Sequence, residues 1–221
     1  MFKSKRRPIV IPQSEHLRLV GTLALLWGNA EFDRPPIAHQ SMIAGMGLHD
    51  RGYGLLDNNP IGEMSDDIWI PIARRSFTLF NSDVVADTIV KYHFRRLARH
   101  SDSAERQALA AEFSQVLAAQ LAQHQLSKEL FDRIDRITNF TDSVSFDFCF
   151  DAPASGSVLI FPKNDEDRAV SVQYQVEEGV IRVDPWPFSV EEYRGYLFAY
   201  HREGYPERLD PFILPYHLKR D

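Results

Sequence analysis

Cysteine is nearly absent from this 221-residue chain. Its single thiol, Cys149, cannot form an internal disulfide, and there is no CxxC pair to indicate structural zinc. The thiol lies in the segment FDFCF, whose phenylalanines predict a buried side chain and argue against a catalytic nucleophile. We therefore expect a protein of a reducing compartment, the cytoplasm.

Long hydrophobic runs are also lacking. The longest apolar stretch without a charge or a proline, residues 19–30, is shorter than the roughly 20 apolar residues that a membrane span needs. The basic N-terminal segment MFKSKRRP is followed by only three apolar residues before the next proline, too few for a signal peptide. We expect neither export nor a membrane anchor.

Positive charge is in deficit, because 25 Lys and Arg residues stand against 31 Asp and Glu residues and the formal net charge is −6. A field of this sign repels nucleic acid and anionic membranes, and only a local basic pocket would attract a polyanionic substrate. We expect a small-molecule substrate as the partner, with no nucleic acid and no membrane. The sequence leaves the oligomeric state open.

Several catalytic motifs are missing as well, since the chain has no GxSxG, P-loop or GxGxxG sequence. It has instead the dipeptide His49-Asp50 in GLHDRGY, with His16 at 33 residues before it and Asp142 at 92 residues after it. Adjacent imidazole and carboxylate groups can bind one ion, and the outer two ligands must then come from other helices. This order predicts a divalent metal site made by His16, His49, Asp50 and Asp142.

Helical periodicity dominates the first two thirds of the chain. It predicts helices over residues 14–27, 36–49, 72–80, 84–98, 104–124 and 127–150, the first of them ended by Gly28. Residues 51–70, rich in Gly, Asn, Asp and Pro, predict a long loop beside the His-Asp pair. Gly45 and Gly47 would each cost a helix about 1 kcal/mol, so we expect close packing against another helix, or a loosened last turn.

Short β-branched segments follow. Residues 9–11, 158–161, 170–176, 180–183, 196–200 and 212–216 predict strands, and 177–179 predict a hairpin turn. The expected fold class is mainly α, with a small antiparallel sheet formed by the N-terminal strand and the C-terminal third. We expect a single domain over 1–221, with a helical core at about 14–150 and a β-rich appendage at about 155–221.

Each candidate ligand also has a simpler interpretation. A histidine near a helix end, such as His16 or His49, is most often exposed or held by an ordinary hydrogen bond. Asp142 has the alternative of a helix-surface carboxylate. However, it lies between Phe140 and Val144 on an apolar turn, where an unpaired carboxylate is costly and a cation would relieve that cost.

His93, in VKYHFRRL, is a further candidate. A helix between the His-Asp pair and the final Asp can direct a substrate-binding group or a second metal ligand into such a site. His100 follows seven residues later near the same face, and the two together would allow two metals. The alternative is a basic solvated face, on which Arg95, Arg96 and Arg99 either meet a phosphate or lie in water.

Five motifs resemble an uncharacterised bacterial family known only as a domain of unknown function. They span nearly the whole chain: SEHxRL at 14–19, HDRGY at 49–53, KYHF at 91–94, TDSVS at 141–145 and DPWPF at 184–188. More distantly, the ligand order is similar to that of the HD superfamily of metal-dependent phosphohydrolases. The chain lacks the extra histidine pairs that mark several HD branches.

The distant resemblance implies an HD-domain-like helical core that holds one divalent ion, Zn, Mn, Mg or Fe, on His16, His49, Asp50 and Asp142. It also implies a metal-activated water that attacks phosphorus, with Asp50 and His93 as catalytic residues and His93 orienting phosphate or acting as general acid. The implied function is a metal-dependent phosphohydrolase for a small phosphorylated or nucleotide-like molecule. Two alternatives stay open: a non-catalytic helical ligand-binding or regulatory protein, and a two-metal oxygenase of the HD type.

Overall fold

Helices fill most of the first two thirds of the chain, as the periodicity predicts. The computed structural model describes every residue except 55–56, 58, 80 and 208–209. No helix in these described ranges is long and apolar enough to cross a membrane. The described helices are α1 (Gln13–Leu26), α2 (His39–Gly47), the 3-10 turn η1 (Arg51–Tyr53), α3 (Asp66–Thr78), α4 (Val84–Arg99), α5 (Ala104–Gln123) and α6 (Lys128–Cys149).

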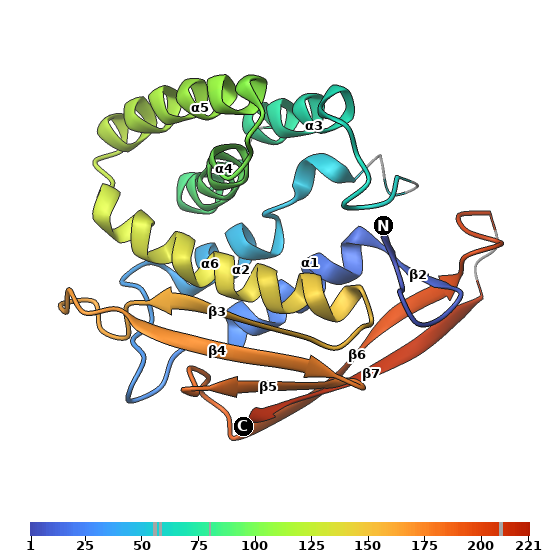
Figure 1. Cartoon of the computed structure of the whole chain (residues 1–221). Helices are drawn as coiled ribbons and strands as arrows, with labels where there is room; N and C mark the ends of the chain where they lie inside the picture. The colour runs from blue at the N-terminus through green and yellow to red at the C-terminus, as the bar shows by residue number, and fades with distance from the viewer. Residues whose placement is uncertain (55–56, 58, 80, 208–209) are drawn as a thin grey trace.

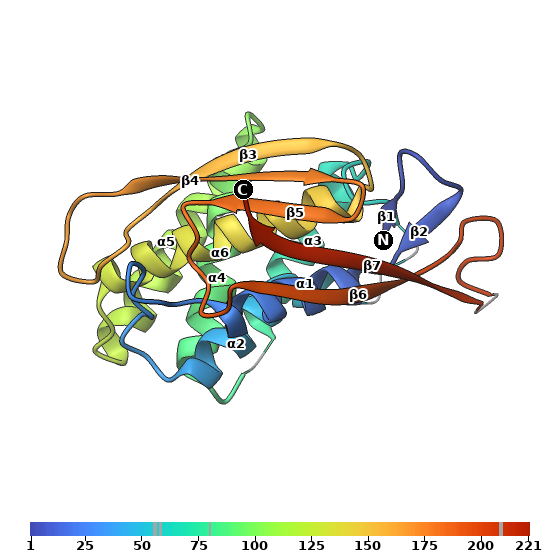
Figure 2. The same ribbon diagram turned by 90° about the horizontal axis from the view of Figure 1, so that it is seen from below.

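A seven-stranded sheet forms the second layer, and α6 and α1 lie along it (Figure 1). Its order is β1-β2-β6-β7-β5-β4-β3, and every neighbouring pair is antiparallel except β5 with β7. Figure 2 shows the sheet from below, with the helices behind it. The strands are β1 (Phe2–Lys3), β2 (Ile9–Ile11), β3 (Ala154–Ile160), β4 (Val170–Glu177), β5 (Val180–Asp184), β6 (Glu192–His201) and β7 (Pro211–Arg220).

The expected fold class, mainly α with a small antiparallel sheet, is wrong. The chain is 45% helical and 22% strand, and its mixed seven-stranded sheet forms a half-barrel. The sequence pattern predicts only the apolar middle of β6 and β7. The paired residues of these strands extend from Glu192 opposite Lys219 to Tyr200 opposite Pro211. The parallel pairing of β5 with β7 joins segments that are distant in sequence, and such pairing leaves no local pattern.

Two helices begin at residues other than those predicted. α3 starts at Asp66, inside the expected loop, because acidic residues in the first turn favour a helix N-terminus. Its expected end, Phe80, lies outside the described residues. α2 begins at His39 and not at Pro36. Gly28 follows the end of α1 as predicted, with a φ of +105° that few other residues adopt.

Close packing against another helix explains Gly45, which faces α4. A Cβ atom at Gly45 would lie 2.8 Å from the Cβ of Ile89 and 3.0 Å from the carbonyl oxygen of Ala86. At Gly47 the same atom would make an ordinary contact, 3.7 Å from the Cα of Gly21. The first glycine therefore sets the distance between α2 and α4, which carry or directly precede three of the candidate site residues.

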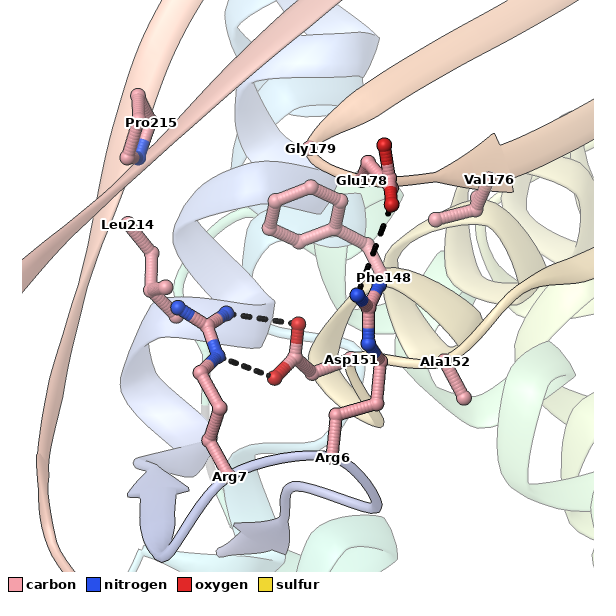
Figure 3. A pocket seen from close by; sticks show the side chains of 10 residues that line it. All are labelled: Arg6, Arg7, Phe148, Asp151, Ala152, Val176, Glu178, Gly179, Leu214 and Pro215. Carbon is pink, nitrogen blue, oxygen red and sulfur yellow. Dashed lines mark hydrogen bonds and ion pairs between the residues drawn. The ribbon is translucent and has the colours of Figure 1, made fainter.

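The loop between β1 and β2 is tied to the end of α6 by charge (Figure 3). Arg7 donates two hydrogen bonds of 2.7 Å to the Asp151 carboxylate, which also accepts a 2.7 Å hydrogen bond from Ser4 Oγ. Arg6 lies 3.7 Å from Glu178 in the turn between β4 and β5. These contacts hold the N-terminal strands of the sheet beside the C-terminus of α6.

The Gly45 contact predicts opposite outcomes for two similar substitutions. Gly45→Ala should lower the free energy of unfolding by about 1–2 kcal/mol, because overpacking against the Ile89 stem and a backbone carbonyl outweighs the gain in helix propensity. Gly47→Ala, the matched control, should leave that free energy unchanged or raise it. Urea unfolding of both variants measures the difference, and equal effects would rule out the close contact.

The Asp151 contacts predict a pH-dependent contribution to stability. Burial raises the pKa of this carboxyl, but the hydrogen bonds from Arg7 and Ser4 and the charge of Arg7 lower it below the ordinary value of 3.8. A lowered folded-state pKa means that the stabilisation is complete above the unfolded-state pKa and is lost as the pH falls through the folded-state value.

Asp151→Asn should therefore lower the free energy of unfolding by about 1 kcal/mol at neutral pH. Asn is suited to this position because φ is +54° there. Denaturant titrations at several pH values should show the difference from the unsubstituted chain shrinking below pH 3.8. A difference that stays constant down to pH 2 would show that the carboxylate charge is not what stabilises this junction.

Candidate metal centre

The residues predicted from the sequence come together where four helical segments converge. His16 is the fourth residue of α1, and His49 and Asp50 lie in the turn directly after α2. His93 comes from α4 and Asp142 from the second half of α6. All five are buried, with His16 and His49 fully enclosed and Asp50 and Asp142 slightly exposed.

Their polar atoms point at one another. The Nε2 atoms of His16 and His49 are 3.0 Å apart, and Asp142 Oδ1 lies 3.4 Å from each of them. Asp50 Oδ2 lies 3.6 Å from His49 Nε2 and 3.8 Å from His16 Nε2. The structure therefore brings the four predicted ligands together, with donor atoms of His16, His49 and Asp142 in one compact group and those of His49, Asp50 and His93 in a second.

These separations fit a coordination shell. Around an ion with bonds of about 2.1 Å, neighbouring ligand atoms are about 3.0 Å apart in an octahedron and about 3.4 Å apart in a tetrahedron. The two imidazole nitrogens are 3.0 Å apart, and the four distances from them to the carboxylate oxygens are 3.4–3.8 Å. Two imidazoles and two carboxylates are also a donor set that suits Zn, Mn or Fe, so the residues fit a divalent ion.

The surroundings of His49 orient it as a ligand. Its Nδ1 lies 2.7 Å from the carbonyl oxygen of Met46, which can only accept, so Nδ1 carries a proton and donates it. A ligating histidine commonly donates its other ring N–H in this way, which directs the Nε2 lone pair to the metal. Ser145 Oγ donates to the backbone oxygen of His16 and fixes α6 against α1 beside the centre.

Both carboxyls are held in their charged form. Burial raises the pKa of Asp142, but hydrogen bonds from His16 and His49 and the charge of His49 lower it well below its usual range. Burial also raises the pKa of Asp50, and the charge of His49 and the hydrogen bond from His93 lower it more. Burial lowers the pKa of His49, but Asp50 and Asp142 raise it above the usual value. Two buried negative charges are thus available to a divalent cation.

The two ring nitrogens of His93 have different partners, Asp50 at Nε2 and Arg96 at Nδ1. Arg96 lies 3.0 Å from His93 Nδ1, and a guanidinium can only donate, so Nδ1 accepts and the ring proton is on Nε2. That Nε2 donates to Asp50 Oδ1 over 3.0 Å. Burial, together with the positive charge of His49, lowers the pKa of His93, which agrees with a neutral ring. In this arrangement His93 positions Asp50 and does not present a free lone pair to an ion.

Other residues singled out in the sequence lie apart from the centre. His100 caps the C-terminus of α4 and is exposed, so it does not join His93. Cys149 is fully buried, as predicted, and burial raises the pKa of its thiol. Arg96 is the exception among the arginines, because its guanidinium lies 3.8 Å from Asp142 Oδ2 as well as against His93.

Gln13 is a site residue that the sequence reasoning missed. It is the first residue of α1, one helical turn before His16, and its Nε2 donates to Asp50 Oδ2 over 2.5 Å. Within the described part of the chain its Oε1 is buried without a hydrogen-bond partner. The spacing of three residues from a suspected ligand on a helix was the only available signal.

The position of His93 predicts how substitutions there affect metal binding. His93→Ala should weaken the affinity for a divalent ion by about 10–100-fold, because the orientation of Asp50 is lost. His93→Gln should retain most of the affinity, since its amide N–H can replace the Nε2 donor. His100→Ala, on the same helix but exposed, is the control. Calorimetric titration with Mn²⁺ measures all three, and an equal loss in both His93 variants would make His93 a ligand.

Comparison with known proteins gives one match. A family model described as a protein of unknown function (DUF3891) matches residues 78–196, which include His93, Arg96 and Asp142 but begin after the His-Asp pair. Searches of curated proteins and of solved structures gave no match. The matched segment is more than half of the chain, from the last residue of α3 into β6, and the chain therefore belongs to the DUF3891 family.

Proposed function

We propose that this protein is a metal-dependent phosphohydrolase of the HD type that acts on a small phosphorylated or nucleotide-like substrate. One observation carries the proposal: carboxylate oxygens of Asp50 and Asp142 each lie 3.4–3.8 Å from the Nε2 atoms of His16 and His49, which are 3.0 Å apart. The order of these ligands along the chain is that of HD phosphohydrolases. A single buried thiol is the support for a cytoplasmic location.

A divalent metal bound here would lower the pKa of a water molecule and polarise a phosphoryl oxygen. In hydrolysis the water oxygen forms a bond to phosphorus, the bond from phosphorus to the leaving oxygen breaks, and that oxygen takes a proton. The slight exposure of Asp50 and Asp142 gives such a substrate its approach, because the three histidines are enclosed. The unpaired Gln13 Oε1 can accept a hydrogen bond from the attacking water.

His93 has a positioning role in this proposal. Its one ring proton is directed to Asp50, and its other nitrogen accepts from Arg96, so neither is free for a leaving group. The Arg96 guanidinium lies 3.0 Å from His93 Nδ1 and 3.8 Å from Asp142 Oδ2. A guanidinium in this place suits the negative charge that develops on a phosphoryl group.

A two-metal oxygenase is supported less well. Ligand atoms of His49, Asp50 and His93 lie within 4.8 Å of one another and would form a second grouping. This second grouping shares His49 with the group of His16, His49 and Asp142, and it needs the Nε2 of His93, which carries the proton given to Asp50. A non-catalytic binding protein would keep the ligand geometry without turnover.

The test is hydrolysis of p-nitrophenyl phosphate by the protein purified without chelator, with Mn²⁺, Mg²⁺, Zn²⁺ and Fe²⁺ added separately. His49→Ala should lower kcat/KM by at least about 100-fold and remove the bound metal, because the imidazole is a ligand. His124→Ala, an exposed histidine at the end of α5, is the control and should change neither quantity.

Three results would contradict the proposal. Unchanged metal content and hydrolysis in His49→Ala would place the chemistry elsewhere. A metal-loaded protein that hydrolyses no phosphate ester would support the non-catalytic alternative. Bound iron together with consumption of O₂, and no phosphate release, would support the oxygenase.

A further inference from the structure

A basic cleft lies beside the metal centre, between α4, α6 and β3. Its volume is about 700 Å³, within the range of small-molecule sites. Five cationic side chains and two carboxylates line it, although the chain as a whole carries a net charge of −6. The charged residues are Arg95, Arg96, Arg99, Lys128, Arg136, Asp132 and Asp135.

Two of these cations have no ion-pair partner in the part of the chain that the structure describes. Arg95 and Lys128 both lie near Asp132, at 3.6 Å and 2.5 Å, and Arg96 pairs with Asp135 at 3.2 Å. Among the residues that the structure describes, neither Arg99 nor Arg136 has a carboxylate within ion-pair distance. Arg136 contacts only the carbonyl oxygen of Leu159, at 3.4 Å, and the ring of Phe161.

The cleft continues to the metal centre through Arg96. This guanidinium lines the cleft, and it also contacts His93 Nδ1 at 3.0 Å and lies 3.8 Å from Asp142 Oδ2. Asn139, which accepts a 2.7 Å hydrogen bond from Arg96, precedes Asp142 by one turn of α6. The two helices α4 and α6, which contribute His93 and Asp142 to the centre, therefore also line the cleft.

We propose that this cleft binds the second phosphate of a substrate that carries at least two phosphate groups, one at the metal centre and one at Arg99 and Arg136. The inference rests on the proposed function only for the phosphate at the metal centre, and the second phosphate site is argued from the cleft itself. Guanidinium groups without counter-charge are suited to phosphate, which they bind by paired hydrogen bonds. The opposite wall includes the exposed side chain of Leu159, which gives the organic part of the substrate an apolar contact.

A small molecule fits the cleft better than a nucleic acid does. Five cationic side chains gather at this cleft, whereas the overall negative charge of the protein opposes the approach of a long polyanion. Arg99 and Arg136 lie six residues, or about 9 Å of helix, from His93 and Asp142, so a small molecule with two phosphate groups on an organic linker can reach both sites.

The experiment compares fructose 1,6-bisphosphate with fructose 6-phosphate by calorimetric titration of the protein as purified. The bisphosphate should bind the unsubstituted chain at least about tenfold more tightly than the monophosphate, because a second group is held by charge-assisted hydrogen bonds. The double variant Arg99→Ser/Arg136→Ser should lose that preference. The double variant Arg6→Ser/Arg194→Ser removes the same charge outside the cleft and should keep it.

Phosphate release from p-nitrophenyl phosphate, measured on the same samples, separates this inference from the proposed function. A bisphosphate preference that depends on Arg99 and Arg136 supports the second phosphate site even if no ester is hydrolysed. Hydrolysis together with an equal preference in both double variants overturns the second phosphate site and leaves the proposed function standing. Tighter binding of a single-stranded oligonucleotide than of the bisphosphate, with the same arginine dependence, would also overturn it.

Discussion

Two carboxylates, Asp50 and Asp142, are buried within a few ångströms of the same two imidazole nitrogens. The arrangement of the helices depends on groups that balance these two negative charges. Buried charges are costly unless they are paired, and here three histidines, a glutamine and an arginine are directed at them. The hydrogen bonds of this cluster join α1, α4, α6 and the turn after α2. A divalent cation at its centre would neutralise both charges at once.

The rest of the fold keeps those groups in place. The half-barrel sheet lies against α6 and α1, and Ser145 links these helices directly beside His16. Gly45 allows α2 to approach α4 closely, which brings the His-Asp turn to His93. Arg96 on α4 then connects the centre to a basic cleft, so that α4 and α6 take part in both.

The candidate site could be predicted from the sequence further than the fold could. The order of His16, His49-Asp50 and Asp142 identified four residues whose side chains the fold brings together. The helices were found because their periodicity is local. The sheet was underestimated because the parallel pairing of β5 with β7 and the charged ends of β6 and β7 are defined by distant partners. Gln13 and the role of His93 depended on contacts that no local pattern contains.

Metal content is the most direct measure of the central claim, that Asp50, Asp142 and two histidines form one metal site. Elemental analysis of protein purified without chelator should find about one divalent ion per chain, and the Asp142→Asn variant should hold far less. If the unsubstituted protein contains no metal and binds none when Zn²⁺, Mn²⁺, Mg²⁺ or Fe²⁺ is titrated in, the cluster is a hydrogen-bonded network and not a metal centre.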